Sequence, residues 1–370
     1  MLTRLFIDNF RCFVNFELRL DRQVLLLGGN GSGKTSVFEA LRRLQSFVLG
    51  EVNVDAAFPS GDLTRWQDLR SQQFELDFQV KDFGAYSYRL IVQHSVDRRL
   101  RRVQEERLLL DNKPLFSCAD AVGQFCRDDE SRGPEILVDH SRSGLSMVLP
   151  RDDNKRLTQF KDRIRRMIVV GFNPFAMSPE TTREQDRLSA QCENFASWYR
   201  YLSQEHQGNV FALLGELRQF IDGFDSFSLR EAGERRILKA LFRHGESGPQ
   251  AYNFDEISEG QRTLFVVYAL LYGLKGLGCS LFLDEPDNWL TLREIQPWLM
   301  ALQDACGSDI EQAIVISHHP EVIDYLGQTL RYFERPNYGS VRVTDELPTP
   351  NSLSLSETIQ RGWESTHGQS

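Results

Sequence analysis

The sequence lacks several features that mark particular classes of protein. None of its 370 residues belongs to a window approaching the roughly 18 consecutive apolar residues of a membrane-spanning helix, which excludes a transmembrane segment. The N-terminus also lacks the uninterrupted apolar stretch of a secretory signal peptide. Basic residues number 43 against 52 acidic ones, and the net charge of −9 excludes a uniformly basic protein that coats nucleic acid.

Cysteine is scarce and unpatterned. The six cysteines form no C-x-x-C pair, and none has a histidine at zinc-finger spacing. We therefore expect reduced thiols in a cytoplasmic protein, rather than a disulfide framework or a metal site. Sustained heptads are absent as well, so no long coiled-coil arm is predicted.

What the chain does contain is an ordinary globular composition, 41% hydrophobic and with 25 phenylalanines, which is ample for a core. Alternating residues predict strands at 2–9 and 14–19 and an antiparallel meander over 74–110. Short apolar runs predict buried strands, which alternate with predicted helices. Buried strands separated by helices are typical of a largely parallel sheet. The predicted buried strands are 24–27, 281–283 and 313–316, and the predicted helices are 33–47, 182–221, one starting near 258, and 292–304.

The strongest motif lies directly after a buried strand and before a helix, where residues 28–35 match G-x-x-x-x-G-K-[ST]. Its glycines let backbone N–H groups wrap a chain of phosphates, and the helix N-terminus adds a favourable dipole. Lys34 is expected to reach the β- and γ-phosphates, and Thr35 to ligate Mg²⁺. The residues predicted to bind nucleotide here are Gly28, Asn30, Gly31, Ser32, Gly33, Lys34, Thr35 and Ser36.

Two further strands end in polar side chains. Asp284 follows an apolar strand and is placed to hold Mg²⁺, while Glu285 suits a general base on the attacking water. The strand at 313–316 leads to His318 and His319, and a histidine there can hydrogen-bond the γ-phosphate. Side chains one residue apart on a strand diverge, so one metal ion would not easily bind both. We assign the γ-phosphate to His318 and a structural role to His319.

A fourth motif precedes the long apolar helix near 258. It consists of Ser258, Glu259, Gly260 and Gln261, followed by Arg262. Ser258 is expected to cap the helix, and Gly260 to permit close approach of backbone. The motif therefore predicts a second helix N-terminus available to phosphate.

The order of these motifs resembles the ABC-type ATPase superfamily over essentially the whole chain, and within it the SMC, RecF and OLD branch. Residues 5–13 are similar to that branch's first strand pair. Residues 284–290 and 317–321 resemble the short AAA/OLD-like ATP-binding proteins of bacterial anti-phage systems. The resemblance implies an α/β fold, a two-lobed ATPase head with a P-loop core sheet, an antiparallel β meander and a helical lobe.

The resemblance also implies ATP and Mg²⁺ as cofactors and an ATP hydrolase whose catalytic residues are Glu285, His318 and Lys34. It implies a homodimer that closes head to tail around two ATP, with a higher oligomer left open. In that dimer Ser258, Glu259, Gly260 and Gln261 act in trans. Arg11 lies where relatives often place a nucleotide-contacting arginine, and an ordinary surface arginine is the alternative.

We expect four segments along the chain. Residues 1–180 form the P-loop core with the meander, and 181–255 the helical lobe with connecting strands. Residues 256–345 carry the signature, the Asp284 strand and the switch histidine. Residues 346–370 form a tail with a short helical stretch ending near Trp363.

The biological role is more open. Too few residues follow His318 for the nuclease domain of OLD proteins, so the sequence favours an ATPase switch that acts on a separately encoded effector, as in anti-phage defence. A RecF-like DNA-repair ATPase, a transporter subunit and a nucleotide-dependent scaffold are the alternatives. Basic clusters at 98–102 and 155–166 leave contact with nucleic acid open. No convincing Q-loop glutamine can be placed.

Overall fold

The computed structural model describes residues 1–245, 248–347 and 353–361, and the chain divides into two compact units. Unit 1 comprises Met1–Met167 and Thr329–Glu346. Unit 2 comprises Ile168–Gln328 and Leu347–Ser370. Within the described ranges, none of the helices has the length and apolarity needed to cross a membrane.

The largest element of unit 1 is an antiparallel sheet of eight strands, in the order β2-β1-β4-β5-β6-β7-β8-β9. Buried and more exposed residues alternate along its central strands, as an antiparallel sheet with one covered face requires. The strands are β1 (Leu2–Asp8), β2 (Phe16–Arg19), β4 (Ser71–Val80), β5 (Gly84–His94), β6 (Arg101–Leu110), β7 (Lys113–Ala119), β8 (Val122–Cys126) and β9 (Arg132–Leu137).

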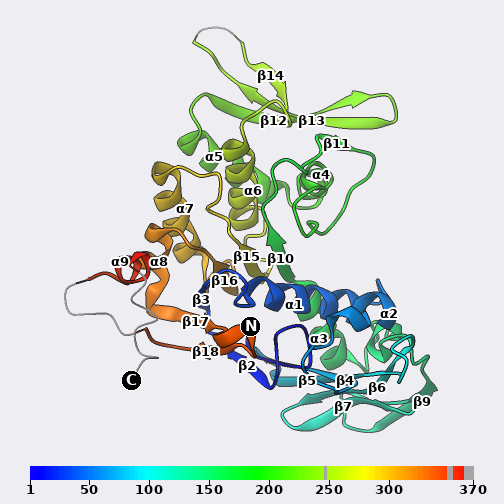
Figure 1. The fold of residues 1–370 in the computed structure, drawn as a ribbon. Helices are drawn as coiled ribbons and strands as arrows, with labels where there is room; N and C mark the ends of the chain where they lie inside the picture. The colour runs from blue at the N-terminus through cyan, green and yellow to red at the C-terminus, as the bar shows by residue number, and fades with distance from the viewer. Residues whose placement is uncertain (246–247, 348–352, 362–370) are drawn as a thin grey trace. The chain divides into compact units, whose positions relative to one another are not determined.

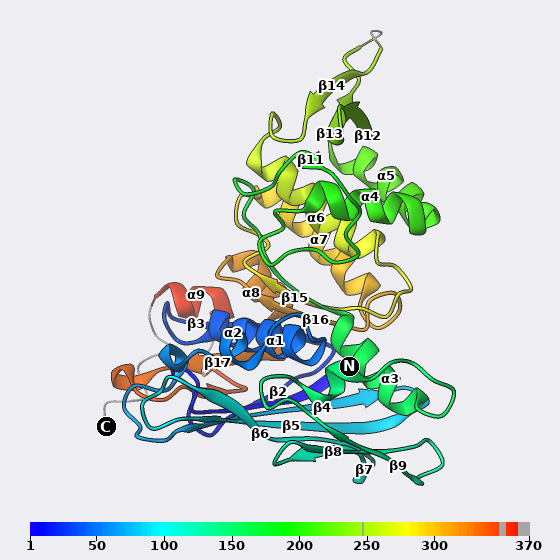
Figure 2. The ribbon, with the colours of Figure 1, turned by 90° about the vertical axis from the view of Figure 1, so that its right-hand side faces the viewer.

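Helices α1 (Lys34–Val48), α2 (Val54–Ala57) and α3 (Lys155–Arg165) lie along one face of this sheet (Figure 2). The ring of Phe160 on α3 packs against three aromatic rings of the sheet, those of Phe78, Tyr86 and Tyr88. Gln45 of α1 donates through Nε2 to the carbonyl of Ile164 at 2.7 Å. Aromatic packing and this buried hydrogen bond therefore join the helices to the sheet and to each other.

A second, mixed group of strands completes unit 1. Strand β3 (Gln23–Gly28) runs parallel to β17 (Leu330–Glu334), which pairs antiparallel with β18 (Arg342–Thr344). Residues 24–28 of β3 are all buried, as expected of a strand covered on both faces. Because β3 and β17 are parallel and pair Gly28 with Phe333, the segments that follow the two strands leave the sheet at the same edge.

Unit 2 contains a short parallel sheet and a group of helices. Strands β10 (Met167–Gly171), β15 (Ser280–Asp284) and β16 (Gln312–Ile316) are adjacent in that order. Helix α6 (Glu259–Tyr272) is buried over ten consecutive residues, which identifies it as the core helix of the unit. The other helices are α4 (Phe195–Glu205), α5 (Gln207–Phe220), α7 (Leu292–Ala305), α8 (Pro320–Leu326) and α9 (Leu355–Gln360).

Beside the helices of unit 2 lies a small antiparallel sheet, in which β14 (Gln250–Asn253) and β12 (Phe224–Ala232) flank β13 (Arg235–Phe242) (Figure 1). The two-residue strand β11 (Glu180–Thr181) also pairs with β13. The aromatic side chains of this sheet pack against the helices: the ring centroids of Phe227 in β12 and Phe265 in α6 lie 4.7 Å apart.

The predicted α/β fold with an antiparallel meander is confirmed, and strands β15 and β16 and helices α6 and α7 fall within two residues of their expected positions. The helix expected over 182–221 is wrong in its first part, because α4 begins only at Phe195. Asn194 explains this: its amide group accepts from the N–H of Ser189 and donates to the carbonyl of Arg187, and such local bonds compete with a helix. The helix in the tail is α9, and Trp363 lies outside the described residues.

Candidate functional site

The glycine-rich motif forms the connection between β3 and α1 in unit 1. The φ angles of Gly31 and Gly33 are +77° and +107°, a region that glycine enters without steric cost. Lys34 is the first residue of α1 and is 6% exposed. Its Nζ donates to the carbonyl oxygens of Gly28 at 2.7 Å and Gly29 at 3.1 Å. The ammonium group thus lies against the loop whose backbone would receive phosphate.

The glycines of the loop have two different surroundings. A Cβ on Gly28, whose φ is +147°, would lie 2.3 Å from the carbonyl oxygen of Phe333 in β17. A Cβ on Gly33 would meet three neighbouring side chains at 3.1 to 3.2 Å. At Gly29 and Gly31 nothing lies within 4 Å. The two ends of the loop are therefore enclosed by protein, while its middle opens outward.

The side chains of the loop fit a chain of phosphates. The hydroxyl of Ser32 is buried, and no hydrogen-bond partner for it exists among the described residues. An orphaned buried hydroxyl is uncommon in proteins and indicates a group that another molecule satisfies. Thr35 is exposed at the start of α1, and Ser36 beside it is half-buried. Hydroxyl oxygen is a ligand that Mg²⁺ accepts, so Thr35 also fits its predicted role.

Arg11 already has acidic partners inside unit 1. Its Nε donates to Oδ1 of Asp62 at 2.8 Å, and Nη2 lies 3.9 Å from Glu39. Arg43 contacts the same two carboxylates. The four residues form an ion-pair cluster in which the Arg11 side chain stays 35% exposed.

In unit 2, the predicted metal-binding and catalytic residues lie at the ends of β15 and β16. The two strands are parallel and pair Asp284 with Ile316, so the residues after each strand leave at one edge of the sheet. Glu285 has φ +51°, and its N–H donates to the carbonyl of Ile316 at 2.9 Å. Nδ2 of Asn288 donates to Oε2 of Glu285 at 2.6 Å and orients the carboxylate. His318 is exposed directly beyond β16.

A third carboxylate, missed by sequence reasoning, lies in the same turn. Asp287 is 6% exposed, and burial raises the pKa of its carboxyl group although the Ser317 hydroxyl hydrogen-bonds to it. Its Oδ1 has no partner within the described part of the chain. The sequence did carry a signal for Asp287, since it is the third acidic residue within four positions of the strand end. His319, in contrast, accepts from the N–H of Glu321 through Nδ1 and caps α8, which is a structural role.

The signature motif begins α6. Oγ of Ser258 accepts from the N–H of Gln261 at 3.3 Å and caps the helix. A Cβ on Gly260 would lie 2.7 Å from the carbonyl oxygen of Trp289, so this position needs glycine for packing within unit 2. The following residue, Arg262, is buried and donates from Nη1 to the carbonyl of Pro174 at 2.6 Å. The N-terminus of α6 is thereby held between the 172–178 segment and the turn after β15.

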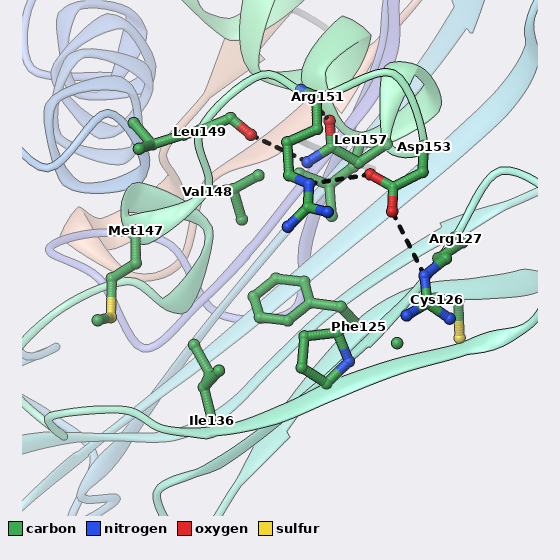
Figure 3. A pocket seen from close by; sticks show the side chains of 13 residues that line it. Phe125, Cys126, Arg127, Ile136, Met147, Val148, Leu149, Arg151, Asp153 and Leu157 are labelled. Carbon is green, nitrogen blue, oxygen red and sulfur yellow. Dashed lines mark hydrogen bonds and ion pairs between the residues drawn. The ribbon is translucent and has the colours of Figure 1, made fainter.

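A cavity of about 480 Å³ lies elsewhere in unit 1, between β8, β9 and the segment 147–157 (Figure 3). Phe125, Ile136 and Met147 line its apolar wall. At its rim Asp153 pairs with Arg151 at 3.1 Å and with Arg127 at 3.4 Å. No residue of the predicted motifs lines this cavity.

The charged clusters outside the motifs have local partners. The carboxylate of Asp128 accepts from the N–H groups of Lys155 and Arg156 and caps α3. Arg101 pairs with Asp55 at 2.9 Å. Across residues 1–245, 248–347 and 353–361, no group of three or more His, Cys, Asp or Glu side chains could hold a metal ion.

Comparison with known families identifies the chain. A family model described as "AAA domain, putative AbiEii toxin, Type IV TA system" matches residues 24–324. The chain belongs to this family. The matched part of this AbiEii-type AAA chain begins in β3 and extends past the signature, Asp284 and His318. The family implies ATP binding. No protein with a curated description matches the chain.

Solved structures of SMC heads are similar to the AbiEii-type AAA chain. An SMC head bound to the C-winged helix domain of ScpA is 15% identical, with a TM-score of 0.57, and the match covers 97% of this chain and 99% of that one. The SMC head domain from Thermotoga maritima is 14% identical, with a TM-score of 0.45, over 94% of this chain and 99% of that one. The first of these likenesses shows that the chain has the fold of an SMC head.

Proposed function

We propose that this AbiEii-type AAA protein is a Mg²⁺-dependent ATPase that acts as a switch, in which two copies close head to tail around two ATP and reopen on hydrolysis. The observation that carries the proposal is the loop between β3 and α1. It combines a buried Lys34 ammonium, the orphaned hydroxyl of Ser32 and open backbone at Gly29 and Gly31. An ammonium group beside backbone that a ligand can approach closely suits a triphosphate better than any uncharged ligand.

In this proposal the side chains divide the work. Lys34 and the loop backbone hold the β- and γ-phosphates. Thr35 and Asp284 hold Mg²⁺, which supplies neutralisation of the phosphate charge when bound. Glu285 accepts the proton of the attacking water, and its bond from Asn288 sets the orientation of the carboxylate. His318 hydrogen-bonds the γ-phosphate and stabilises the charge that develops there.

The signature residues serve the partner's nucleotide in this proposal. Ser258, Glu259, Gly260 and Gln261 form the first turn of α6, whose N-terminus carries the positive end of the helix dipole. The packing of Gly260 against the Trp289 carbonyl supports the assignment, because a rigid N-terminus presents its N–H groups in a fixed direction.

We further propose that the switch controls a separately encoded effector in bacterial defence. The description of the family names a toxin of a toxin–antitoxin system, which supports that setting. The similar SMC head carries a domain of another protein, ScpA, which supports a head that works through a separate chain. Nucleic acid is the alternative load of the switch.

The first experiment tests the switch. Glu285→Gln is expected to preserve ATP binding, slow hydrolysis by about 100-fold or more, and double the mass measured by light scattering in Mg-ATP. Lys34→Ala is expected to lose ATP binding, and the exposed Glu234→Gln serves as the matched control. A Glu285→Gln variant whose mass is independent of nucleotide would contradict the dimer. A variant that hydrolyses ATP at the wild-type rate would contradict the catalytic assignment.

The second experiment identifies the load. Purification of the Glu285→Gln variant from its native host is expected to bring down an effector protein in ATP and to release it without nucleotide. A preparation that contains the variant alone in both conditions would overturn the effector proposal. Strong stimulation of the ATPase by DNA would replace it with a RecF-like repair role.

A further inference from the structure

The cavity between β8, β9 and the segment 147–157 has the size and the lining of a site for a small molecule. Its volume of about 480 Å³ falls within the range of roughly 300–1,000 Å³ that is typical of ligand pockets. Phe125, Ile136 and Met147 give it an apolar wall. Met147 is 54% exposed, and Leu149, which also lines the cavity, is 75% exposed. Apolar side chains that meet water around a hollow indicate a surface that a ligand covers.

Polar contacts fix the backbone of the segment that covers the cavity. Lys161 of α3 donates from Nζ to the carbonyl of Val148 at 2.8 Å. Asn154 donates from Nδ2 to the carbonyl of Leu149 at 3.0 Å, and its Oδ1 accepts from the N–H of Arg151 at 2.8 Å. Because these bonds hold the segment away from the sheet, the apolar walls do not close on one another. A ligand with an apolar body would make the contacts that the walls leave unmade.

The mouth of the cavity carries a net positive charge. The charged residues that line the cavity are Arg127, Arg151 and Asp153. The Asp153 carboxylate lies 3.1 Å from Nε of Arg151 and 3.4 Å from Nε of Arg127. Figure 3 shows this carboxylate between the two guanidinium groups. One carboxylate shared by two arginines leaves one positive charge, and guanidinium groups bind further carboxylates well.

The edge of the sheet beside the cavity is poorly suited to another strand. Strand β9 is the last of the eight in the sheet, and an edge strand can pair with an extended peptide. Pro134 lies within β9 and has no N–H to donate. The carbonyl of Gly133 already accepts from Nε2 of Gln124 at 3.0 Å. These features favour a ligand that enters the cavity over a peptide that lies along β9.

We propose that this cavity binds a small amphipathic carboxylate, of which a medium-chain fatty acid is the simplest form. The hydrocarbon chain lies against Phe125, Ile136 and Met147, and the carboxylate lies at the mouth beside Arg127 and Arg151. The inference goes beyond the proposed function and does not depend on it, because none of these residues belongs to the predicted nucleotide site.

The first test measures the charge preference by calorimetry with decanoate, 1-decanol and decyltrimethylammonium, which share one chain length. Decanoate is expected to bind at one site and decyltrimethylammonium more weakly. Arg151→Gln makes the mouth neutral and is expected to raise the Kd for decanoate by about 5- to 30-fold, with the Kd for decanol unchanged. Asp153→Asn adds a positive charge and is expected to lower the Kd for decanoate. Arg99→Gln, an exposed arginine that also pairs with an aspartate, is the matched control.

The second test fills the cavity. Met147→Trp is expected to abolish binding of decanoate and decanol, because the larger side chain occupies the space of the hydrocarbon chain. Met300→Trp on α7, where the methionine is 58% exposed, is the matched control and is expected to bind both normally. Leu149→Trp provides a second filling variant, and circular dichroism verifies that each variant is folded.

The outcomes decide the inference. Absence of decanoate binding to the wild type, or unchanged binding to both folded tryptophan variants, would overturn the site. Equal Kd values for decanoate and decyltrimethylammonium, unaffected by Arg151→Gln, would overturn the assignment of a carboxylate. A protein that co-purifies with the wild type but not with Met147→Trp, together with no binding of decanoate, would replace the ligand with a protein partner. Lys34→Ala is expected to bind decanoate as the wild type does, which keeps this inference separate from the nucleotide site.

Discussion

Replacing Gly28 with alanine tests whether the first glycine of the P-loop is required by the fold or by the ligand. In the structure a Cβ at Gly28 would lie 2.3 Å from the carbonyl oxygen of Phe333, in the strand paired with β3. The φ of +147° is also unfavourable for any residue with a side chain. We therefore expect Gly28→Ala to destabilise unit 1 even when no nucleotide is present.

The magnitude follows from these two terms. Strained backbone costs about 1–3 kcal/mol, and overpacking costs about another 1–3 kcal/mol, so the loss of stability is about 2–6 kcal/mol. For a unit of this size each kcal/mol lowers the melting temperature by about 2–4 °C, which gives a fall of about 4–24 °C. Gly29→Ala is the matched control, because nothing lies within 4 Å of its Cβ position, and it is expected to stay within about 0.5 kcal/mol of the wild type.

The assay is thermal and urea unfolding of both variants without nucleotide, with circular dichroism as the measured signal. Equal melting temperatures for Gly28→Ala and Gly29→Ala would refute the reasoning, since only Gly28 combines a positive φ with a neighbour in close contact with the new methyl group. A fall confined to the nucleotide-bound protein would show that Gly28 serves the ligand alone.

Two more predictions concern other positions. Gly260→Ala is expected to lower the stability of unit 2 by about 1–3 kcal/mol, because the new Cβ would lie 2.7 Å from the Trp289 carbonyl oxygen. Gly215→Ala in α5, with open space around it, is the control in the same melting assay. Equal melting temperatures for the two variants would contradict the close approach. Burial lowers the pKa of His94 from 6.5 to about 4, so the folded state binds fewer protons than the unfolded state between these values and stability falls as the pH decreases through this window. His94→Gln is expected to remove this slope in urea midpoints measured from pH 7 to pH 4, and parallel profiles would count against it.

Sequence patterns predicted those parts of the fold where one physical signal dominates. Strands β15 and β16 are buried apolar runs ending at Asp284 and Ile316. Polar residues at each end allow the bounds of both strands to be predicted from the sequence. Helix α6 was predicted from its cap at Ser258. Strand β9, in contrast, is mostly exposed and shows no alternation, so the meander extends further than the pattern indicates.

The candidate site was predictable only where it coincides with a local motif. The carboxylate of Asp287 becomes conspicuous once its burial is known, since sequence alone does not distinguish it from a solvated turn residue. Trp66 and Arg335 are far apart in the chain and belong to no motif, yet the guanidinium carbon of Arg335 lies 5.6 Å from the centre of the Trp66 ring. Their proximity is a property of the tertiary fold, because β17 runs parallel to β3 and the N–H of Thr64 donates to Oδ1 of Asn9.

The glycines of the P-loop motif differ in their surroundings, so they are expected to serve different purposes. Gly28 and Gly33 are enclosed by protein, whereas Gly29 and Gly31 face open space. The enclosed pair would be needed to pack β17 and α1 against the loop even without a ligand, and the open pair leaves room for phosphate. A substitution at the enclosed pair is therefore expected to act first on stability, and one at the open pair first on affinity. Measuring both quantities for each glycine separates the two functions that the motif combines.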